Sequence, residues 1–313
     1  MKKFFYANIL SLLPLLSASP AFAQETFTEP EVEAISVEED EAVVIPPLFE
    51  YVMAPDDMPD LQSRTDYLMD HFWDPFDFKN TTAVDQNALN HAFGVYVQAM
   101  PYASPKKVTD SVKKLIGKIK SNPGLSFQFA KAAEENLFGQ RADYWIDDFY
   151  IDFIENLLNN KKVRDSQKKH FASQLEMLKR NAIGSPLPAF SVVNVNGTPS
   201  TLTPQKEFVL IEIVQPENAD QRYTMLKMDI SGVLNDLIEE GRLEIDVVNL
   251  ADSIPSLNYP EKWNVFVSDQ AGKVFDLRKN PSFYVISSDG KIAGKNLDVD
   301  EAINLIDYLS KSK

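Results

Sequence analysis

The stretch of sequence that decides the fold reads FVLIEIV, from Phe208 to Val214. This run is apolar enough to predict a strand that is covered on both faces of its sheet. Two further strands are predicted downstream, over Leu243–Leu250 and Ser282–Ser287. The segment around Phe208–Val214 therefore predicts the interior of a buried sheet.

Helical segments alternate with these strands. One helix is expected from about Asn218 to Glu240, and an amphipathic helix over Glu301–Leu309 follows the last strand. Strands that alternate with helices predict an α/β domain with a mixed central sheet. The residue pattern changes at the stretch GSPLP, from Gly184 to Pro188. We therefore expect this domain over residues 184–313.

The chain before residue 184 has a different pattern. Between Ser63 and about Arg180, apolar residues recur at helical spacing. Ser104-Pro105 and Asn122-Pro123 are helix starts, and Gly139 is a helix stop. The pattern predicts six short helices, enough to enclose a core. The predicted fold class is therefore an N-terminal all-α helical domain over residues 63–183, followed by the α/β domain.

The first residues predict export. Met1-Lys2-Lys3 precedes a short apolar run that closes on Ala21-Phe22-Ala23, which is typical of a signal peptide over residues 1–23. The run is too short and too interrupted by proline to span a bilayer. No cysteine is present to carry a lipid. We expect a soluble periplasmic protein that is neither a lipoprotein nor inserted in the membrane.

An acidic segment follows the predicted cleavage site. Residues 24–62 contain twelve Asp and Glu residues and no Lys or Arg. With its many prolines, this composition predicts a largely disordered leader. Its apolar patch from Val43 to Phe49 is the part that could fold back onto the body of the protein.

The overall composition excludes several classes of function. The formal net charge is −15, whereas nucleic-acid binding requires a basic face. The cysteine count is zero, although an exported protein could form disulfides. Disulfides, thiolate metal sites and cysteine nucleophiles are therefore excluded.

Several phrases within residues 184–313 resemble the thioredoxin-like domains of periplasmic thiol–disulfide oxidoreductases and their peroxiredoxin relatives. They are GSPLPAF from Gly184, the Asn196-Gly197 turn, VQPE from Val214, NPSFYV from Asn280 and DGKI from Asp289. In that family a Cys-x-x-Cys pair follows the first central strand. The matching positions here are Asn218 and Gln221, so the resemblance implies a thioredoxin-like domain without redox activity.

The helical part carries a second resemblance. The phrases RTDYL from Arg64 and HFWDPFDF from His71 resemble a helical domain of unknown function. That domain precedes thioredoxin-like domains in exported proteins of gut-type Gram-negative anaerobes. This resemblance implies that a helical domain precedes a thioredoxin-like domain. It does not indicate any activity for the helical domain.

The candidate binding site is the degenerate redox position, formed by Asn218, Gln221, Asn280 and Pro281. Asn218 and Gln221 also have the spacing of a helix-capping pair, which is the structural alternative for these two residues. Pro281 matches the family's cis-proline, and Asn280 matches the residue whose backbone pairs with a bound peptide in active relatives. The structural alternative for Pro281 is that it only fixes the shape of its turn and takes no part in binding.

No catalytic residue, metal ligand or cofactor is assigned from the sequence. His71, His91 and His170 lie far apart and outside any zinc-binding spacing. The acidic run from Asp143 to Glu155 favours a solvated helix face over a calcium loop.

These observations lead to two hypotheses. The first is a non-enzymatic, redox-inactive module that binds a protein or peptide in the periplasm. The alternative is an enzyme of non-thiol chemistry, whose site lies between the two domains and uses carboxylates such as Asp70, Asp74 or Asp77. An open groove beside Asn280 and Pro281 would favour the first, and convergent polar groups in an interdomain pocket the second. The sequence does not indicate an oligomeric state.

Overall fold

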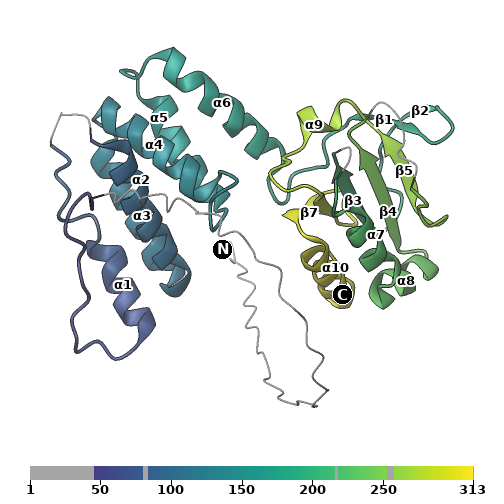
Figure 1. Cartoon of the computed structure of the whole chain (residues 1–313), viewed down its shortest axis with the longest axis horizontal. Coiled ribbons are helices and arrows are strands. Elements are labelled where there is room, and N and C mark those ends of the chain that lie inside the picture. The colour runs from purple at the N-terminus through teal and green to yellow at the C-terminus, as the bar shows by residue number, and fades with distance from the viewer. Residues whose placement is uncertain (1–45, 80–83, 216–217, 252–256, 313) are drawn as a thin grey trace, which may run out of the picture.

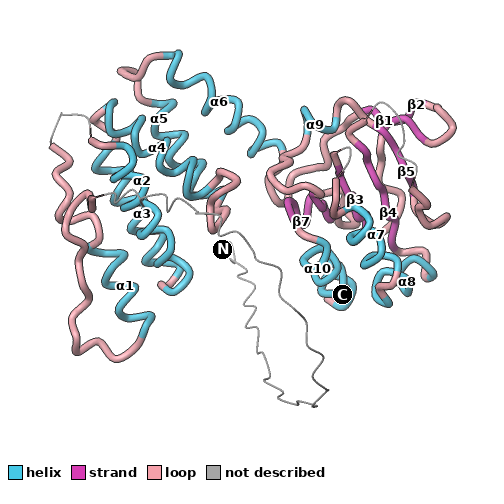
Figure 2. Tube along the Cα trace, viewed as in Figure 1, coloured by secondary structure: helices cyan, strands magenta, loops and turns pink. Residues whose placement is uncertain are grey.

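The computed structural model describes residues 46–79, 84–215, 218–251 and 257–312. The predicted signal peptide and the first part of the predicted leader lie outside these ranges. Within them, a helical half is followed by a half built on a sheet, as Figures 1 and 2 show.

The described helical half contains six α-helices, which confirms the number predicted from the sequence. They are α1 (Leu61–His71), α2 (Gln86–Ala99), α3 (Pro105–Ile119), α4 (Pro123–Leu137), α5 (Asp147–Asn159) and α6 (Asp165–Arg180), with a 3-10 turn η1 (Met100–Tyr102) after α2. The Asn122-Pro123 signal acts as predicted, because the Asn122 side chain accepts hydrogen bonds from the first backbone N–H groups of α4.

Aromatic side chains fill the core of this half. Trp73 is buried and lies edge-on to Phe129, with 5.2 Å between ring centroids. Leu48 and Phe49 pack against the same core, and the Phe49 ring contacts those of Phe72 and Trp73. Leu48 and Phe49, at the end of the apolar patch in the predicted leader, therefore fold back onto the helices. The driving force is burial of apolar surface, which outweighs the cost of ordering a short segment.

The second half is a mixed sheet of seven strands, in the order β2-β1-β5-β4-β3-β6-β7. The strands are β1 (Ser191–Asn194), β2 (Pro199–Thr201), β3 (Phe208–Val214), β4 (Leu243–Asn249), β5 (Asn264–Val267), β6 (Ser282–Ile286) and β7 (Ile292–Leu297). β3 pairs with β4 in parallel and with β6 in antiparallel fashion. The predicted α/β domain with a mixed sheet is confirmed.

Strand β3 is buried along its whole length, as its sequence predicts. Leu210 and Val214 face the core beneath α7 (Gln221–Asp229), α8 (Gly232–Glu239) and α10 (Val299–Lys311), whereas Val209 and Ile213 face the core beneath the short α9 (Ala271–Val274). Alternate side chains of a strand point to opposite faces, so both faces of β3 are covered.

The predicted helix over Asn218–Glu240 is wrong in its extent, because two helices occupy this stretch. α7 ends at Asp229, and α8 begins at Gly232 after Ser231. The Ser231 hydroxyl accepts a hydrogen bond from the Leu234 backbone N–H, which caps the start of α8. The break follows from the preference of serine for this position, since its oxygen satisfies a backbone donor that no helical carbonyl reaches.

Candidate binding groove

An open groove lies beside the turn that contains Asn280 and Pro281. Its volume is about 420 Å³, within the range of small-ligand sites. Its lining comes from the start of α7, the turn before β6 and the start of α10, namely Asp220, Tyr223, Thr224, Lys279, Asn280, Pro281, Phe283, Asp298, Val299 and Asp300. The peptide bond between Asn280 and Pro281 is cis, which confirms the prediction from the resemblance. The groove required by the binding hypothesis is therefore present.

Asn280 presents its backbone at the edge of this groove. Its side-chain Oδ1 accepts a hydrogen bond from the Gln215 backbone N–H at 3.1 Å, which ties the turn to the end of β3. Within the part of the chain that the structure describes, neither the backbone N–H nor the carbonyl of Asn280 makes a hydrogen bond. Asn280 is exposed. Its main chain is therefore free to pair with an extended ligand.

The other two residues of the predicted site do not line the groove. Asn218 lies just before α7, where its side chain accepts a hydrogen bond from the Asp220 backbone N–H at 2.8 Å. The N-cap of α7 is Asp220, so the predicted Asn218–Gln221 capping pair is wrong. The Gln221 side chain is buried and donates to Asn249 Oδ1 at 3.2 Å and to the Tyr259 hydroxyl at 2.9 Å. Its amide is therefore used inside the fold rather than offered to a ligand.

A buried carboxyl group lies behind the groove, at Glu212 on β3. Its Oε1 accepts a hydrogen bond from the Thr224 hydroxyl at 2.8 Å, and Thr224 also lines the groove. Its Oε2 has no hydrogen-bond partner among the described residues. Burial raises the pKa of Glu212 to about 7, against a smaller lowering by Thr224. Glu212 is not among the candidates predicted from the sequence, although a lone acid in the run FVLIEIV is the signal that could have found it.

A second, larger cavity lies between the helical half and the sheet half. It measures about 840 Å³, and its lining includes Trp145 and Asp147 from one half and Arg278 and Lys295 from the other. Arg278 reaches Asp147 at 2.8 Å and Asp276 at 2.6 Å. The Lys295 ammonium lies 2.6 Å from Asp147 and 3.2 Å from Asp276. These two cations and two carboxylates neutralise one another, so they join the halves instead of presenting free charge to the cavity.

Asp276 is the innermost member of this network. It is fully buried, and burial alone would raise the pKa of its carboxyl group. Hydrogen bonds and charge from Arg278 and Lys295 outweigh burial and hold the pKa of Asp276 below its ordinary value. The Arg278 guanidinium also stacks on the rings of Phe138 and Trp145, at 4.4 and 4.7 Å from their centroids. Asp276 is therefore ionised within a closely packed network.

The carboxylates named for the enzyme alternative are not in this cavity. Asp70 pairs with Lys107, and Asp74 pairs with His71, Lys114 and Lys118, all on or beside α1 and α3. Asp77 accepts a hydrogen bond from the Lys79 backbone N–H. None of the three lines the space between the halves, so their predicted placement between the domains is wrong.

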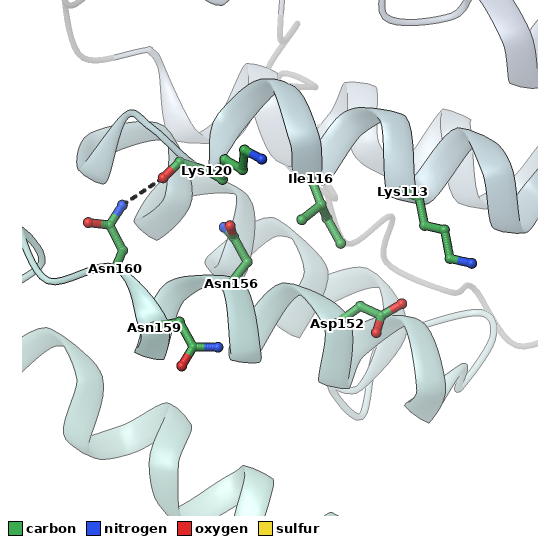
Figure 3. Close-up of a pocket in the computed structure, with 7 residues that line it drawn as sticks. All are labelled: Lys113, Ile116, Lys120, Asp152, Asn156, Asn159 and Asn160. Atoms are coloured by element: carbon green, nitrogen blue, oxygen red, sulfur yellow. Dashed lines mark hydrogen bonds between the residues drawn. The ribbon is translucent and has the colours of Figure 1, made fainter.

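Figure 3 shows a third hollow, between α3 and α5. Its volume is about 440 Å³, and its polar lining consists mainly of lysine and asparagine side chains with Asp152. The Asn160 side chain donates to the Lys120 carbonyl at 3.1 Å, the dashed line in the figure. Burial, then Glu155 and Asp148, raise the pKa of Asp152. The charge of Lys113, which also lines the hollow, opposes this rise.

No group of three or more His, Asp or Glu side chains among the described residues is arranged to hold a metal ion. None of their helices combines the length and apolarity needed to cross a bilayer.

Similarities to known proteins agree with this architecture. A family model described as a domain of unknown function, DUF5106, matches residues 21–181. A thioredoxin-like protein from Bacteroides caccae superimposes with a TM-score of 0.68 at 17% identity, covering 84% of this chain and 99% of that chain. The thioredoxin-like fold is thereby shown, together with the helical half that precedes it.

Two further solved structures match a smaller share of the chain. A thiol:disulfide interchange protein from a Bacteroides species has a TM-score of 0.33 at 18% identity, covering 43% of this chain and 94% of its own. A thiol-disulfide oxidoreductase from Bacteroides fragilis has a TM-score of 0.32 at 12% identity, covering 40% and 99%. No curated protein matches the chain.

Proposed function

Because the chain belongs to the family of the domain of unknown function DUF5106, and its sheet half has a thioredoxin-like fold without cysteine, we propose that it is a redox-inactive binding protein. Its ligand is a peptide or an extended segment of another protein. Its site is the groove beside Asn280 and Pro281. The proposed role is non-enzymatic.

The observation that carries this proposal is the unengaged main chain of Asn280. An extended segment can add to free backbone N–H and carbonyl groups as a short strand, while its side chains occupy the adjoining space. The groove supplies about 420 Å³ of such space directly beside this residue. Because the Asn280 side chain is bonded to Gln215, the turn is held in place before a ligand arrives.

The enzyme alternative receives less support. The charged groups between the halves are bonded to one another, through Asp147, Asp276, Arg278 and Lys295. A catalytic carboxylate needs access to a substrate proton or atom within about 3 Å. The carboxylates at Asp70, Asp74 and Asp77 are instead engaged on the helical half, at its surface.

The groove is tested by removing an aromatic side chain from its wall. We expect Tyr223→Ala to weaken peptide binding about tenfold or more, because loss of a packed aromatic contact at a binding site costs about 2 kcal/mol. The ligand is the tightest binder selected from phage-displayed random dodecapeptides, labelled with fluorescein and measured by fluorescence anisotropy. Tyr102→Ala is the matched control, since Tyr102 is 53% exposed and Tyr223 57%, and Tyr102 lies on the helical half. Equal affinities for wild type and Tyr223→Ala would place the site elsewhere.

The same peptide tests the main-chain pairing to Asn280. N-methylation of one peptide residue at a time removes a single backbone donor. We expect affinity to fall at one or two positions by roughly fivefold or more, because an unpaired buried hydrogen-bonding group costs about 1–3 kcal/mol. An even profile along the peptide would contradict pairing through the backbone.

We further propose that the protein is exported to the periplasm after cleavage between Ala23 and Gln24. The support is the sequence of residues 1–23, with its basic start, apolar run and small residues before the cleavage site. N-terminal sequencing of the protein from the periplasmic fraction is expected to begin at Gln24. Recovery from the cytoplasm with Met1 or Lys2 at the N-terminus would contradict export.

A further inference from the structure

An exposed apolar stripe runs along α7 beside the groove. Tyr223, Leu226 and Ile230 are 57%, 57% and 70% exposed. Their spacing of three and four residues places them on one side of the helix. The opposite side of α7 is buried through Thr224 and Met228. The exposed side is therefore largely apolar, with the Lys227 ammonium lying 5.2 Å from the centroid of the Tyr223 ring.

This stripe is continuous with the groove. Tyr223 belongs to both, because its side chain also lines the cavity beside Asn280. Seven residues of α-helix rise about 10 Å from Tyr223 to Ile230, the length of about three residues of extended chain. A segment that pairs with Asn280 can therefore continue outward over Leu226 and Ile230.

The rim of the groove carries an excess of negative charge. Asp220, Asp298 and Asp300 line it, against one lining cation, Lys279. That lysine is shared between Glu301 at 2.8 Å and Asp298 at 4.0 Å. Lys227 pairs with Asp300. Asp220 makes no ion pair with any described residue.

From these contacts we propose that the ligand is an extended segment with basic and apolar residues in alternation. Its apolar side chains lie on the stripe of Tyr223, Leu226 and Ile230, and its basic side chains face Asp220 and the acidic rim. Unbalanced carboxylates beside an apolar surface favour such a ligand through Coulomb attraction, and they repel an acidic one. This assignment of a ligand class rests on the proposed function of the groove.

The probes are two fluorescein-labelled octapeptides, one alternating leucine with lysine and the other leucine with glutamate. We expect the lysine peptide to bind the wild-type protein at least about tenfold more tightly than the glutamate peptide in fluorescence anisotropy. Leu226→Ser is expected to weaken the lysine peptide about fivefold, by loss of buried apolar area. Asp220→Asn is expected to weaken it about threefold and to reduce its salt dependence.

Matched controls separate the stripe and rim from general attraction to an acidic protein. Leu61→Ser removes an equally exposed leucine, 59% exposed on α1. Asp307→Asn removes a half-buried carboxylate near the far end of α10, paired there with Lys311. We expect both controls to bind the lysine peptide as the wild type does. Losses as large in the controls as in Leu226→Ser and Asp220→Asn would overturn the proposal.

The failure of this inference differs from the failure of the proposed function. Suppose that both octapeptides bind equally, and that binding depends on Tyr223 but not on Leu226 or Asp220. The proposed ligand class is then wrong, whereas the groove remains the binding site. If Tyr223→Ala changes the affinity of neither the selected dodecapeptide nor the two octapeptides, the groove is not the binding site. The proposed ligand class is then wrong as well.

Discussion

Replacement of Arg278 with alanine is expected to lower the free energy of unfolding by about 3 kcal/mol, because two largely buried carboxylates would then share the single cation Lys295. The Arg278 side chain is 8% exposed and bonds to two carboxylates, and one of them, on Asp276, is completely buried. The same substitution removes the stacking on Phe138 and Trp145. The loss should be visible as a lower midpoint in urea unfolding.

The Arg278 network joins the helical half to the sheet half, so a second effect is expected. Asp147, Phe138 and Trp145 belong to the helical half, whereas Asp276 and Arg278 belong to the sheet half. Calorimetry of Arg278→Ala should resolve two transitions where the wild type shows more cooperative unfolding, because coupling between the halves is weakened.

A second arginine provides the control for this experiment. Arg242 pairs with Glu207 and Glu240 within the sheet half, and its side chain is 32% exposed, against 8% for Arg278. Ion pairs that solvent reaches contribute less to stability than fully buried ones lose when a partner is removed. Arg242→Ala should therefore change the midpoint much less than Arg278→Ala and leave the coupling between halves intact. Similar losses of unfolding free energy in the two variants would show that the network between the halves stabilises the protein no more than the Arg242 pairs do.

The features that could be predicted from sequence are those encoded by local pattern. The apolar run Phe208–Val214 specifies its own burial, and the Asn122-Pro123 signal specifies the start of α4. The cis bond before Pro281 followed from a resemblance in order and spacing along the chain. The break between α7 and α8 was missed because Ser231 interrupts a pattern that otherwise reads as one helix.

The parts that could not be predicted depend on partners distant in sequence. Gln221 looks like half of a capping pair until Asn249 and Tyr259 are placed beside it by β4 and the chain after it. The pairing of Arg278 with Asp147 joins two halves whose relative placement no local pattern specifies. The candidate site therefore differs from the predicted one. Asn280 and Pro281 line the groove, whereas Asn218 and Gln221 do not, and residues such as Tyr223 form its wall instead.

The stability of the protein is expected to fall as pH rises from about 5 to about 7, and Glu212→Gln is expected to remove a large part of that fall. The folded state raises the pKa of Glu212 from its ordinary 4.5 to about 7. Between these values the folded state holds a proton that the unfolded state releases, so stability is complete below about 4.5 and is lost progressively toward 7. At about 1.4 kcal/mol per pKa unit, the loss is about 3 kcal/mol.

Urea unfolding at pH 5, 6, 7 and 8 measures this effect. Glutamine keeps an oxygen that can accept the Thr224 hydroxyl and cannot ionise, so Glu212→Gln should match the wild type near pH 5 and exceed its unfolding free energy by up to about 3 kcal/mol at pH 8. Part of the slope should persist in the variant, because burial also raises the pKa of Asp246. Glu176→Gln, at an exposed position on α6, controls for the loss of one carboxylate. A Glu212→Gln variant with the wild-type slope between pH 5 and 7 would mean that the pKa of this carboxyl group is not raised in the folded protein.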